Sequence, residues 1–319
     1  MKQYLLSIYQ ADADPPPPEC LIPPRVQSRL TQRVTRADMH ISGDRRLAWH
    51  RACWSHDGPM SAPPGTEPVA GAMADAPRLA ERLALRRRPG GLPAGFQHWR
   101  RLLFVHWPLA PDLLRPLVPP GLSLDLYEGM AWVSLTPFVV QAARPLGAPR
   151  WLGLSFLETN VRTYVHVAGR QPGVYFFSLD AASLLAVVGA RTTLDLPYMY
   201  AHGREHHSAS AVDYRLRRCA DPWAVCHARY APGEPTGSAE PGSLDFFLIE
   251  RYLLHVQRGR SLWTVQVHHR PYPLQRVNSL RLDQTLVSAD GLPPVAGTPL
   301  AHFSPGVNVA IFPPRIRAV

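Results

Sequence analysis

The chain has 319 residues, of which 46% are hydrophobic, and its formal net charge is +10 at pH 7. This length accommodates one large domain or two ordinary ones, with enough apolar side chains for a buried core. The positive charge is almost entirely arginine, because Lys2 is the only lysine. The basic residues form only short runs without interleaved aromatic side chains, and no nucleic-acid-binding motif accompanies them. We therefore expect no nucleic-acid partner.

Cysteine usage and hydropathy exclude two further classes of protein. Four cysteines in a chain of this size do not indicate a disulfide framework. The apolar run at residues 184–190 is far shorter than the roughly 18 residues that a membrane span requires. The first apolar residues of the chain meet acidic residues at once, which is not the pattern of a signal peptide. The sequence therefore predicts a soluble, cytoplasmic protein with no membrane partner.

Residues 1–90 are not typical of a folded domain. They contain a run of four prolines at 15–18 and a second segment, 61–72, that is rich in proline and small residues. Such a composition buries too little apolar surface to offset the chain entropy lost on folding. We predict a largely disordered extension with a short amphipathic helix at residues 76–88. The strand-like residues 1–10 resemble the opening strand of YCII-type small domains. Either a fused module or an upstream-extended reading frame would explain them, so it stays open whether residues 1–90 belong to the native protein.

From residue 96 onward, β-rich apolar segments alternate with turns that contain proline or glycine. Short helices are expected at 111–117 and 181–189. Strands are expected at 102–107, 122–126, 131–140, 158–167, 174–179 and 191–196.

The second half of the chain continues this pattern. Segment 211–217 is expected to pair with 224–230, segment 246–256 with 261–268, and a last strand to form at 307–312. Between them, His202 and His206 stand at helical spacing in AHGREHHSA. They lack a third ligand, so we expect an exposed loop and no metal site. Many strands with few short helices predict an α+β, mainly antiparallel fold whose sheet closes or nearly closes.

The strand at 158–167 has two chemically different faces, because side chains two residues apart share one face of a strand. One face consists of valines and a threonine. The other consists of hydrogen-bonding side chains, namely Glu158, Asn160, Arg162, Tyr164 and His166. A row of this kind most often faces solvent, but inside a closed sheet it would form the polar wall of a pocket.

Several motifs in order resemble a known family. The segments FVHW, LLRPLVPPGLSLD, FLETNVRTYV, GVYFFSLD, ARTTLDLPY, FFLIERY and HHRPYPL lie between residues 96 and 314. They are similar to the YqjF-like bacterial family, which has no known function and itself resembles the acetoacetate decarboxylase superfamily. The resemblance implies one domain at 91–319 with a cone-shaped β-barrel, a few short helices and a pocket for a small oxygenated ligand. It places the 158–167 polar row inside the barrel.

The same resemblance excludes the superfamily's best-known reaction. The decarboxylases have an arginine, a proline six residues later, and then the lysine that forms a Schiff base. Arg191 and Pro197 match this spacing, but Tyr198 follows the proline. A phenol cannot form an imine, and the domain contains no lysine at all. We therefore expect no imine-forming decarboxylation and leave open whether the protein is an enzyme.

The candidate site residues each have a structural alternative. Arg191 would bind a carboxylate, or pair with Glu158 or Asp180. Glu158 would transfer protons if burial raised its pKa, or form an ion pair with Arg162 or Arg191. Tyr198 would donate to a carbonyl oxygen, or anchor a backbone corner. The remaining candidates for ligand contact are Asn160, Arg162, Tyr164 and His106, the last of which is more often a core histidine.

Two functions fit these residues. One is a lyase-type enzyme that acts on a small carboxylated or keto compound without forming an imine, with Arg191, Glu158 and Tyr198 converging on one cavity. The other is a non-catalytic small-molecule-binding or sensor protein that uses the same cavity. Neither requires a cofactor, and a homo-oligomer is compatible with both.

Overall fold

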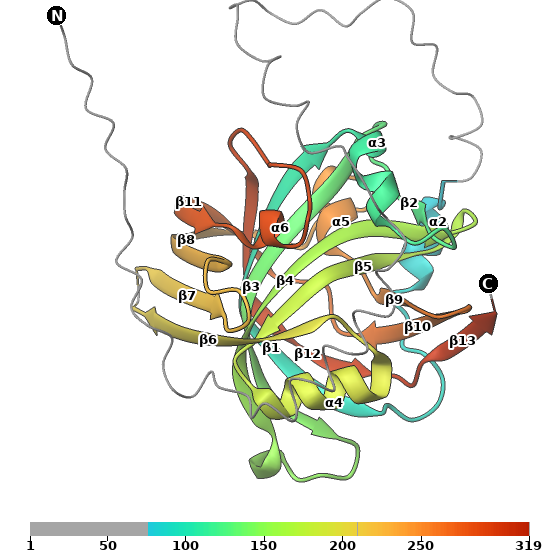
Figure 1. The fold of residues 1–319 in the computed structure, drawn as a ribbon, viewed down its shortest axis with the longest axis horizontal. Helices are drawn as coiled ribbons and strands as arrows, with labels where there is room; N and C mark the ends of the chain where they lie inside the picture. Colours follow the sequence, from blue (N-terminus) through green and yellow to red (C-terminus); the bar gives the residue numbers. More distant parts are fainter. Residues whose placement is uncertain (1–75, 209, 319) are drawn as a thin grey trace, which may run out of the picture. The chain divides into compact units, whose positions relative to one another are not determined.

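The computed structural model describes residues 76–208 and 210–318, and the predictions for residues 1–75 lie outside this part of the chain. The described residues contain one large sheet with a few short helices (Figure 1). The strands are β1 (Gly95–Leu109), β2 (Ser123–Leu124), β3 (Ala131–Pro145), β4 (Leu154–Val167), β5 (Arg170–Ala181), β6 (Tyr198–His207), β7 (Val212–Arg218), β8 (Val225–Gly237), β9 (Leu253–Arg258), β10 (Ser261–His268), β11 (Leu274–Gln284), β12 (Leu300–Ile311) and β13 (Arg315–Ala318). The helices are α2 (Leu79–Ala84), α3 (Pro111–Leu114), α4 (Leu184–Leu194), α5 (Leu244–Ile249) and α6 (Leu286–Ala289), with 3-10 turns η2 (Arg115–Leu117) and η3 (Arg150–Leu152).

The sheet closes on itself twice. Strands β5, β4, β3, β1 and β12 are neighbours in that order, and they form a wall common to both rings. Strands β9 and β10 join the two ends of this wall to make the first ring, through the β5–β9 and β10–β12 pairings. Strands β6, β7, β8 and β11 join the same two ends to make the second ring. Most of the pairings are antiparallel, so the predicted fold class is confirmed.

The alternation of side chains assigns each residue of the common wall to one ring or the other. On β1, Leu102 and Phe104 belong to one hydrophobic core, whereas Leu103 and Val105 belong to another. All four side chains are buried, because both faces of the wall are covered. The first ring therefore encloses one core and the second ring encloses the other.

Helix α2 lies within the range expected for a short helix, and it packs on the strands. Arg82 forms an ion pair with the buried Asp125, at 2.6 Å from Nη2 to Oδ1, and stacks over the ring of Phe247. Arg86 similarly stacks over Phe246, at 4.8 Å from its guanidinium carbon to the ring centroid. These contacts hold residues 78–86 against the sheet, although the expected domain boundary lies at residue 90.

Three local predictions differ from the structure. Segment 191–196 does not form a strand, because helix α4 continues to Leu194. The Ser183 side chain caps the start of this helix by accepting a hydrogen bond from the Ala186 amide. The helix ends where Asp195 adopts a left-handed backbone conformation. Residues 244–249 form helix α5, capped by Ser243, where a strand was expected. The histidines at 202 and 206 lie on strand β6 and do not form a helical pair or a loop.

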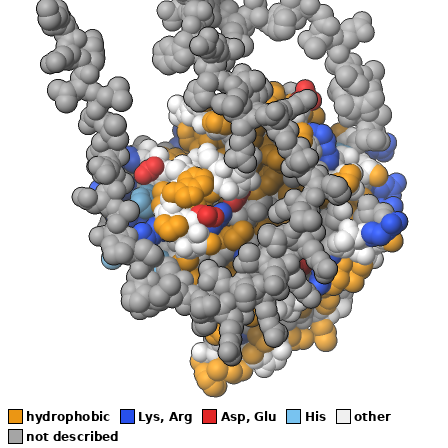
Figure 2. Space-filling model, in the orientation of Figure 1, with side chains coloured by type: hydrophobic (Ala, Val, Ile, Leu, Met, Phe, Trp, Pro, Cys, Tyr) orange, Lys and Arg blue, Asp and Glu red, His pale blue; other side chains and the backbone are white. Residues whose placement is uncertain are grey.

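On the part of the face that Figure 2 shows in colour, arginine side chains are interspersed with hydrophobic and polar groups. No helix of the described residues is long and apolar enough to cross a membrane.

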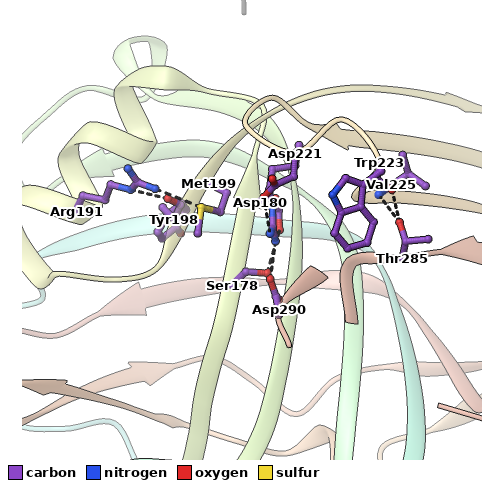
Figure 3. A network of polar contacts seen from close by, with 11 residues as sticks. Ser178, Asp180, Arg191, Tyr198, Met199, Asp221, Trp223, Val225, Thr285 and Asp290 are labelled. Carbon is purple, nitrogen blue, oxygen red and sulfur yellow. Dashed lines mark hydrogen bonds and ion pairs between the residues drawn. The ribbon is translucent and has the colours of Figure 1, made fainter. Parts of the chain in front are cut away.

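A buried ion network fastens the common wall to the second ring (Figure 3). Arg218 of β7 donates to both carboxylate oxygens of Asp180 on β5, at 2.7 and 2.9 Å, and to Asp290 at 2.8 Å. Ser178 donates to the same Asp180 at 3.0 Å. The side chains of Asp180 and Arg218 are almost inaccessible to solvent, so each depends on the other for compensation of its charge.

Replacing Arg218 should therefore destabilise the protein strongly. The Arg218→Met substitution leaves two buried carboxylates without their cation, and we expect the free energy of unfolding to fall by about 3–5 kcal/mol. Urea denaturation followed by circular dichroism measures this loss. The control is Arg215→Met on the same strand, since the ion pair of Arg215 with Asp213 is solvent-exposed and its removal should leave the unfolding midpoint nearly unchanged. Equal effects of the two substitutions would contradict the assignment.

Candidate functional site

The first ring encloses a cavity of about 190 Å³. On the same measure, a single water molecule needs roughly 10–15 Å³, so the cavity holds more than isolated waters. Its walls are mostly apolar and aromatic, with a small number of polar side chains. It is lined by Gln97, Trp99, Leu102, Phe104, Thr136, Phe138, Glu158, Asn160, Arg162, Val174, Phe176, Leu179, Ala190, Leu194, Leu196, Tyr198, Arg251, Tyr252, Leu253, Leu254, Val265, Val267, Tyr272 and Ile311.

The polar wall of the cavity contains three of the five side chains expected in the row on β4. Glu158, Asn160 and Arg162 occupy alternate positions of this strand and all three line the cavity. The register of β3 against β4 places Thr136 directly opposite Asn160, and in an antiparallel pair such residues share one face. The row therefore faces the interior of the first ring, as the family resemblance implied.

Glu158 is a buried carboxyl with a perturbed pKa. It is 4% exposed, and its Oε2 accepts a hydrogen bond of 3.0 Å from the Tyr198 hydroxyl. Burial raises the pKa of Glu158 to about 7, and the nearby Asp180 charge also raises it, while hydrogen bonds from Tyr198 and Asn160 act in the opposite direction. Near neutral pH this carboxyl is therefore present in both its protonated and its ionised form, as a group that exchanges protons requires.

Tyr198 is placed by the end of the α4 segment. It begins β6 directly after Pro197 and pairs in parallel with Leu179 of β5, which brings its ring into the cavity wall. Burial and the Glu158 carboxylate both raise the pKa of the Tyr198 phenol well above its usual value. The single phenolic proton is engaged with Glu158. Tyr198 is thus a partner that orients the carboxyl, and in this arrangement it has no proton free for a ligand carbonyl.

Arg162 is a buried cation without an acidic partner. Among the described residues, no carboxylate forms an ion pair with it, although only 9% of the residue is exposed. One Nη2 contact of 3.4 Å reaches the Leu248 carbonyl, and the guanidinium stacks over Phe104 at 5.6 Å. Its Nε is buried and has no hydrogen-bond partner in the described part of the chain. A buried charge in this condition is costly unless a ligand compensates it.

Arg251 adds a second guanidinium to the same cavity. It donates from Nη1 to Asp125 at 2.6 Å and from Nε to the Phe247 carbonyl at 2.7 Å. Burial lowers the pKa of Arg251 to about 10 and the neighbouring Arg82 also lowers it, against the attraction of Asp125. Since Asp125 serves both Arg82 and Arg251, the two cations share one anion. The Nη2 of Arg251 is buried and has no partner among the described residues.

His106 and Tyr164 do not line the cavity but form a hydrogen-bonded chain behind it. Tyr164 donates to the Leu248 carbonyl at 2.9 Å, and its oxygen lies 2.5 Å from the Ser134 hydroxyl, which lies 2.6 Å from His106 Nδ1. The Leu248 carbonyl has no proton to donate, so the Tyr164 hydroxyl must donate to it. The Ser134 hydroxyl then donates to the Tyr164 oxygen, and His106 Nδ1 donates to the Ser134 oxygen. Burial lowers the pKa of His106 well below its usual value, so this imidazole is neutral. Both residues are better described as core groups than as ligand contacts.

Arg191 is not among the residues that line this cavity, where it was expected to bind a carboxylate. It lies in the last turn of α4, and its Nε donates to the backbone carbonyl of Tyr198 at 2.6 Å (Figure 3). Its Nη2 lies 3.3 Å from the sulfur of Met199. The Arg191 guanidinium therefore fastens α4 to the start of β6. The structure brings Glu158 and Tyr198 together as expected, but Arg162 takes the place in the cavity that was predicted for Arg191.

Sequence reasoning overlooked the aromatic part of the cavity. Trp99, Tyr252 and Tyr272 come from β1 and from the segments that flank β9 and β11, and they meet only when the ring closes. Phe104 packs edge-on against Tyr272, with ring centroids 5.3 Å apart. The motifs FFLIERY and HHRPYPL contain Arg251, Tyr252 and Tyr272, and they were the sequence feature that could have indicated these residues. Their position relative to the pocket could be known only once the order of the strands in the sheet was known.

Comparison with known sequences agrees with this architecture. Residues 96–308 match the DUF2071 family, which is described as an uncharacterized conserved protein. The chain is 40% identical over 228 residues to the uncharacterized protein YqjF of Bacillus subtilis (strain 168), and the match covers 71% of this chain and 94% of that protein. These matches confirm the resemblance that the sequence motifs indicated.

Solved structures extend the comparison to fold. The enduracididine biosynthesis enzyme MppR complexed with pyruvate aligns with a TM-score of 0.52 at 14% identity, covering 71% of this chain and 91% of that chain. Acetoacetate decarboxylase from Legionella pneumophila subsp. pneumophila str. Philadelphia 1 aligns with a TM-score of 0.50 at 13% identity, covering 72% and 92%. At these identities the likeness shows the fold alone, and it confirms an acetoacetate-decarboxylase-like arrangement of strands.

The Glu158 pKa generates a prediction about the Tyr198 hydrogen bond. Because the Tyr198 hydroxyl stabilises the ionised carboxyl, Tyr198→Phe should raise the pKa of Glu158 above about 7. The measurement is a carbon-13 NMR titration of the Glu158 carboxyl in both proteins. Tyr230→Phe is the matched control, since Tyr230 is also buried but belongs to the other core, where it donates to the Arg101 carbonyl. A Glu158 titration that is unchanged in Tyr198→Phe would contradict the assigned hydrogen bond.

The same pKa also governs how stability varies with pH. A carboxyl whose folded pKa is about 7 and whose usual value is 4.5 binds its proton more tightly in the folded state, so its contribution to stability falls as pH rises from 4.5 to 7. Glu158→Gln removes this loss. We expect the stability of the variant relative to the parent to improve by about 3 kcal/mol between pH 4.5 and pH 8. Urea unfolding at a series of pH values measures the difference, and a difference independent of pH would refute the raised pKa.

Proposed function

The chain belongs to the YqjF-like family of uncharacterised proteins, and we propose that this member binds a small carboxylated or keto compound in the cavity of the first ring. The observation that carries the proposal is the Arg162 guanidinium, which lines the cavity, is buried and has no acidic partner among the described residues. A guanidinium presents parallel donors that match the two oxygens of a carboxylate.

The charges around the cavity support an anionic ligand. Arg162 is uncompensated, and Arg82 and Arg251 share the single carboxylate of Asp125. The one carboxyl that lines the cavity, Glu158, carries only part of its charge near neutral pH, because burial raises its pKa to about 7. The described cavity therefore has an excess of positive charge in a poorly solvated space, where attraction to an anion is strong.

Glu158 is the group suited to proton transfer. It lies four residues from Arg162 on the same face of β4, so the distance between their Cα atoms is about 13 Å along the strand. Both residues line the same cavity, so a small ligand can contact the two groups at once. In this arrangement the guanidinium binds the carboxylate, and Glu158 gives a proton to or takes one from a carbon or oxygen atom farther along the ligand.

The reaction class is limited by what the cavity lacks. In acetoacetate decarboxylases a lysine forms an imine with the substrate, whereas here Tyr198 stands at that position and the domain 91–319 contains no lysine. A lyase-type or proton-transfer reaction on a keto or hydroxy compound, with charge development stabilised by Arg162, remains compatible with these residues. The structure of MppR complexed with pyruvate supports a ligand of this size in a related fold.

A non-catalytic binding or sensor role is the alternative, and one observation favours it. The hydroxyl of Tyr198 donates its single proton to Glu158, and one N–H of the Asn160 amide is engaged with the same carboxyl, so the Tyr198 phenol is not free to polarise a ligand carbonyl. A carboxyl that is held by hydrogen bonds within the protein suits recognition at least as well as chemistry.

The proposal predicts that ligand binding depends on Arg162 and not on Arg191. In thermal-shift measurements with pyruvate, acetoacetate and butyrate, the parent protein should be stabilised by at least one of these acids, with the shift growing as concentration rises. Arg162→Met should abolish that shift, because the anion loses its cation. Arg191→Met should retain it, although the variant itself melts earlier, since Arg191 fastens α4 outside the cavity. A shift that survives in Arg162→Met and disappears in Arg191→Met would reverse the assignment.

Turnover separates the enzyme from the binding protein. A stabilising acid is incubated with the parent and with Glu158→Gln in deuterium oxide, and its carbon-bound protons are followed by NMR. Exchange or conversion in the parent, reduced at least a hundredfold in the variant, indicates proton transfer by Glu158. Binding without exchange or conversion in either protein identifies the alternative.

A further inference from the structure

The cavity contains a second set of unsatisfied polar atoms that differ in kind from those of the arginines. The Oγ1 of Thr136 and the Oδ1 of Asn160 are buried, and neither has a hydrogen-bond partner in the described part of the chain. Buried polar atoms are nearly always hydrogen-bonded, by the protein or by what the protein binds. Both residues line the cavity.

Strand register places these two atoms close together. Thr136 on β3 lies directly opposite Asn160 on β4, one position of the inward row away from Arg162. Directly opposite residues have Cβ atoms about 4.5–5.5 Å apart, so one ligand group can reach both side chains. The row continues to Glu158, which pairs in register with Phe138.

The hydrogen bonds already present determine what this pair accepts. The side chain of Asn160 donates to the Glu158 carboxylate, and only its amide nitrogen can donate. The amide oxygen is an acceptor that has no partner among the described residues, and it lies beside the second N–H of the same amide. Tyr198 also gives its proton to Glu158, which leaves the phenol oxygen with acceptor capacity only. Around Thr136 the wall thus offers two acceptors, the Asn160 amide oxygen and the Tyr198 phenol oxygen, and the threonine hydroxyl can either donate or accept.

We propose that the ligand carries a hydrogen-bond donor, a hydroxyl or amino group, that binds between Thr136 and Asn160 while its carboxylate binds Arg162. The ligand class is then a hydroxy or amino carboxylic acid. This inference rests on the proposed function for the position of the carboxylate, and it adds the group that distinguishes the ligand from a simple keto acid. A carbonyl oxygen at this point meets the Asn160 oxygen, whereas a hydroxyl donates to it and accepts from Thr136.

The chemistry of the neighbouring Glu158 is consistent with such a ligand. A hydroxyl held by Thr136 and Asn160 lies beside a carboxyl that exchanges protons near neutral pH. Glu158 can therefore act on the carbon or oxygen next to that hydroxyl, while Arg162 holds the other end. The donor group fixes the orientation of the ligand in a cavity whose remaining walls are mostly apolar and do not discriminate between its ends.

The test compares ligands that share a carbon skeleton. Dissociation constants are measured by isothermal titration calorimetry for butyrate, acetoacetate, 3-hydroxybutyrate, 4-hydroxybutyrate and 3-aminobutyrate. We expect at least one donor-bearing acid to bind roughly tenfold or more tightly than both butyrate and acetoacetate, because it satisfies acceptors that the other two leave unpaired. If the acids bind but the donor-bearing ones have no advantage, the inference is overturned and the proposed function stands. If none of these acids binds, both are overturned.

A matched pair of variants assigns the preference to the proposed atoms. Thr136→Val keeps the shape of the side chain and removes its hydroxyl, and it should reduce the preference for the donor-bearing acid to within about threefold of butyrate while the affinity for butyrate changes little. Thr163→Val is the control, since this threonine is as deeply buried but lies on the opposite face of β4, where it donates to the Trp132 carbonyl. A preference that persists in Thr136→Val, or that disappears equally in Thr163→Val, overturns the assignment.

Discussion

The constraint on which this structure depends is that one wall of strands is buried on both faces. Strands β5, β4, β3, β1 and β12 belong to two rings at once, so most positions along their central parts, above all those of β4, are shielded from solvent on both faces. Successive residues such as Leu103 and Phe104 therefore enter different cores. A polar side chain in this wall has no access to water and must find a partner inside the protein or in a ligand.

Most buried charges in the protein meet that requirement internally. Asp180 and Asp290 share Arg218, and Asp125 holds two arginines. Among the buried charges of residues 76–208 and 210–318, Arg162 and Glu158 form no ion pair, and they lie on the same strand facing the same cavity. Arg162 keeps its charge without an acidic partner among the described residues. Glu158 avoids the cost of a buried charge by binding a proton near neutral pH. The candidate site is thus the part of the wall where buried charges lack compensation by an ion pair among the described residues, and we propose that a ligand supplies it.

The sequence allowed the fold class and one wall of the site to be predicted, and the physical reasons are specific. Alternation in β4 identified the row from Glu158 to Arg162, because strand periodicity is a local property. The choice between helix and strand at 191–196 was harder to predict, because this segment contains the end of a helix and a turn before Pro197. The roles of Arg162 and Arg191 could not be separated from sequence, because both are arginines near acidic residues and only the closure of the ring shows which one enters the cavity.

The double-sided wall also bears on how such a protein can change over evolutionary time. Inserting or deleting one residue in β4 would exchange its two faces, sending Glu158 toward the second core and Val161 into the cavity, and neither core could accommodate the result. Changes of ligand must therefore arise by substitution at alternate positions, which leaves the other core untouched. The strands of family members can therefore keep their length and hydrophobic spacing, while the residues that face the cavity, at every second position, change to suit the compound that is bound.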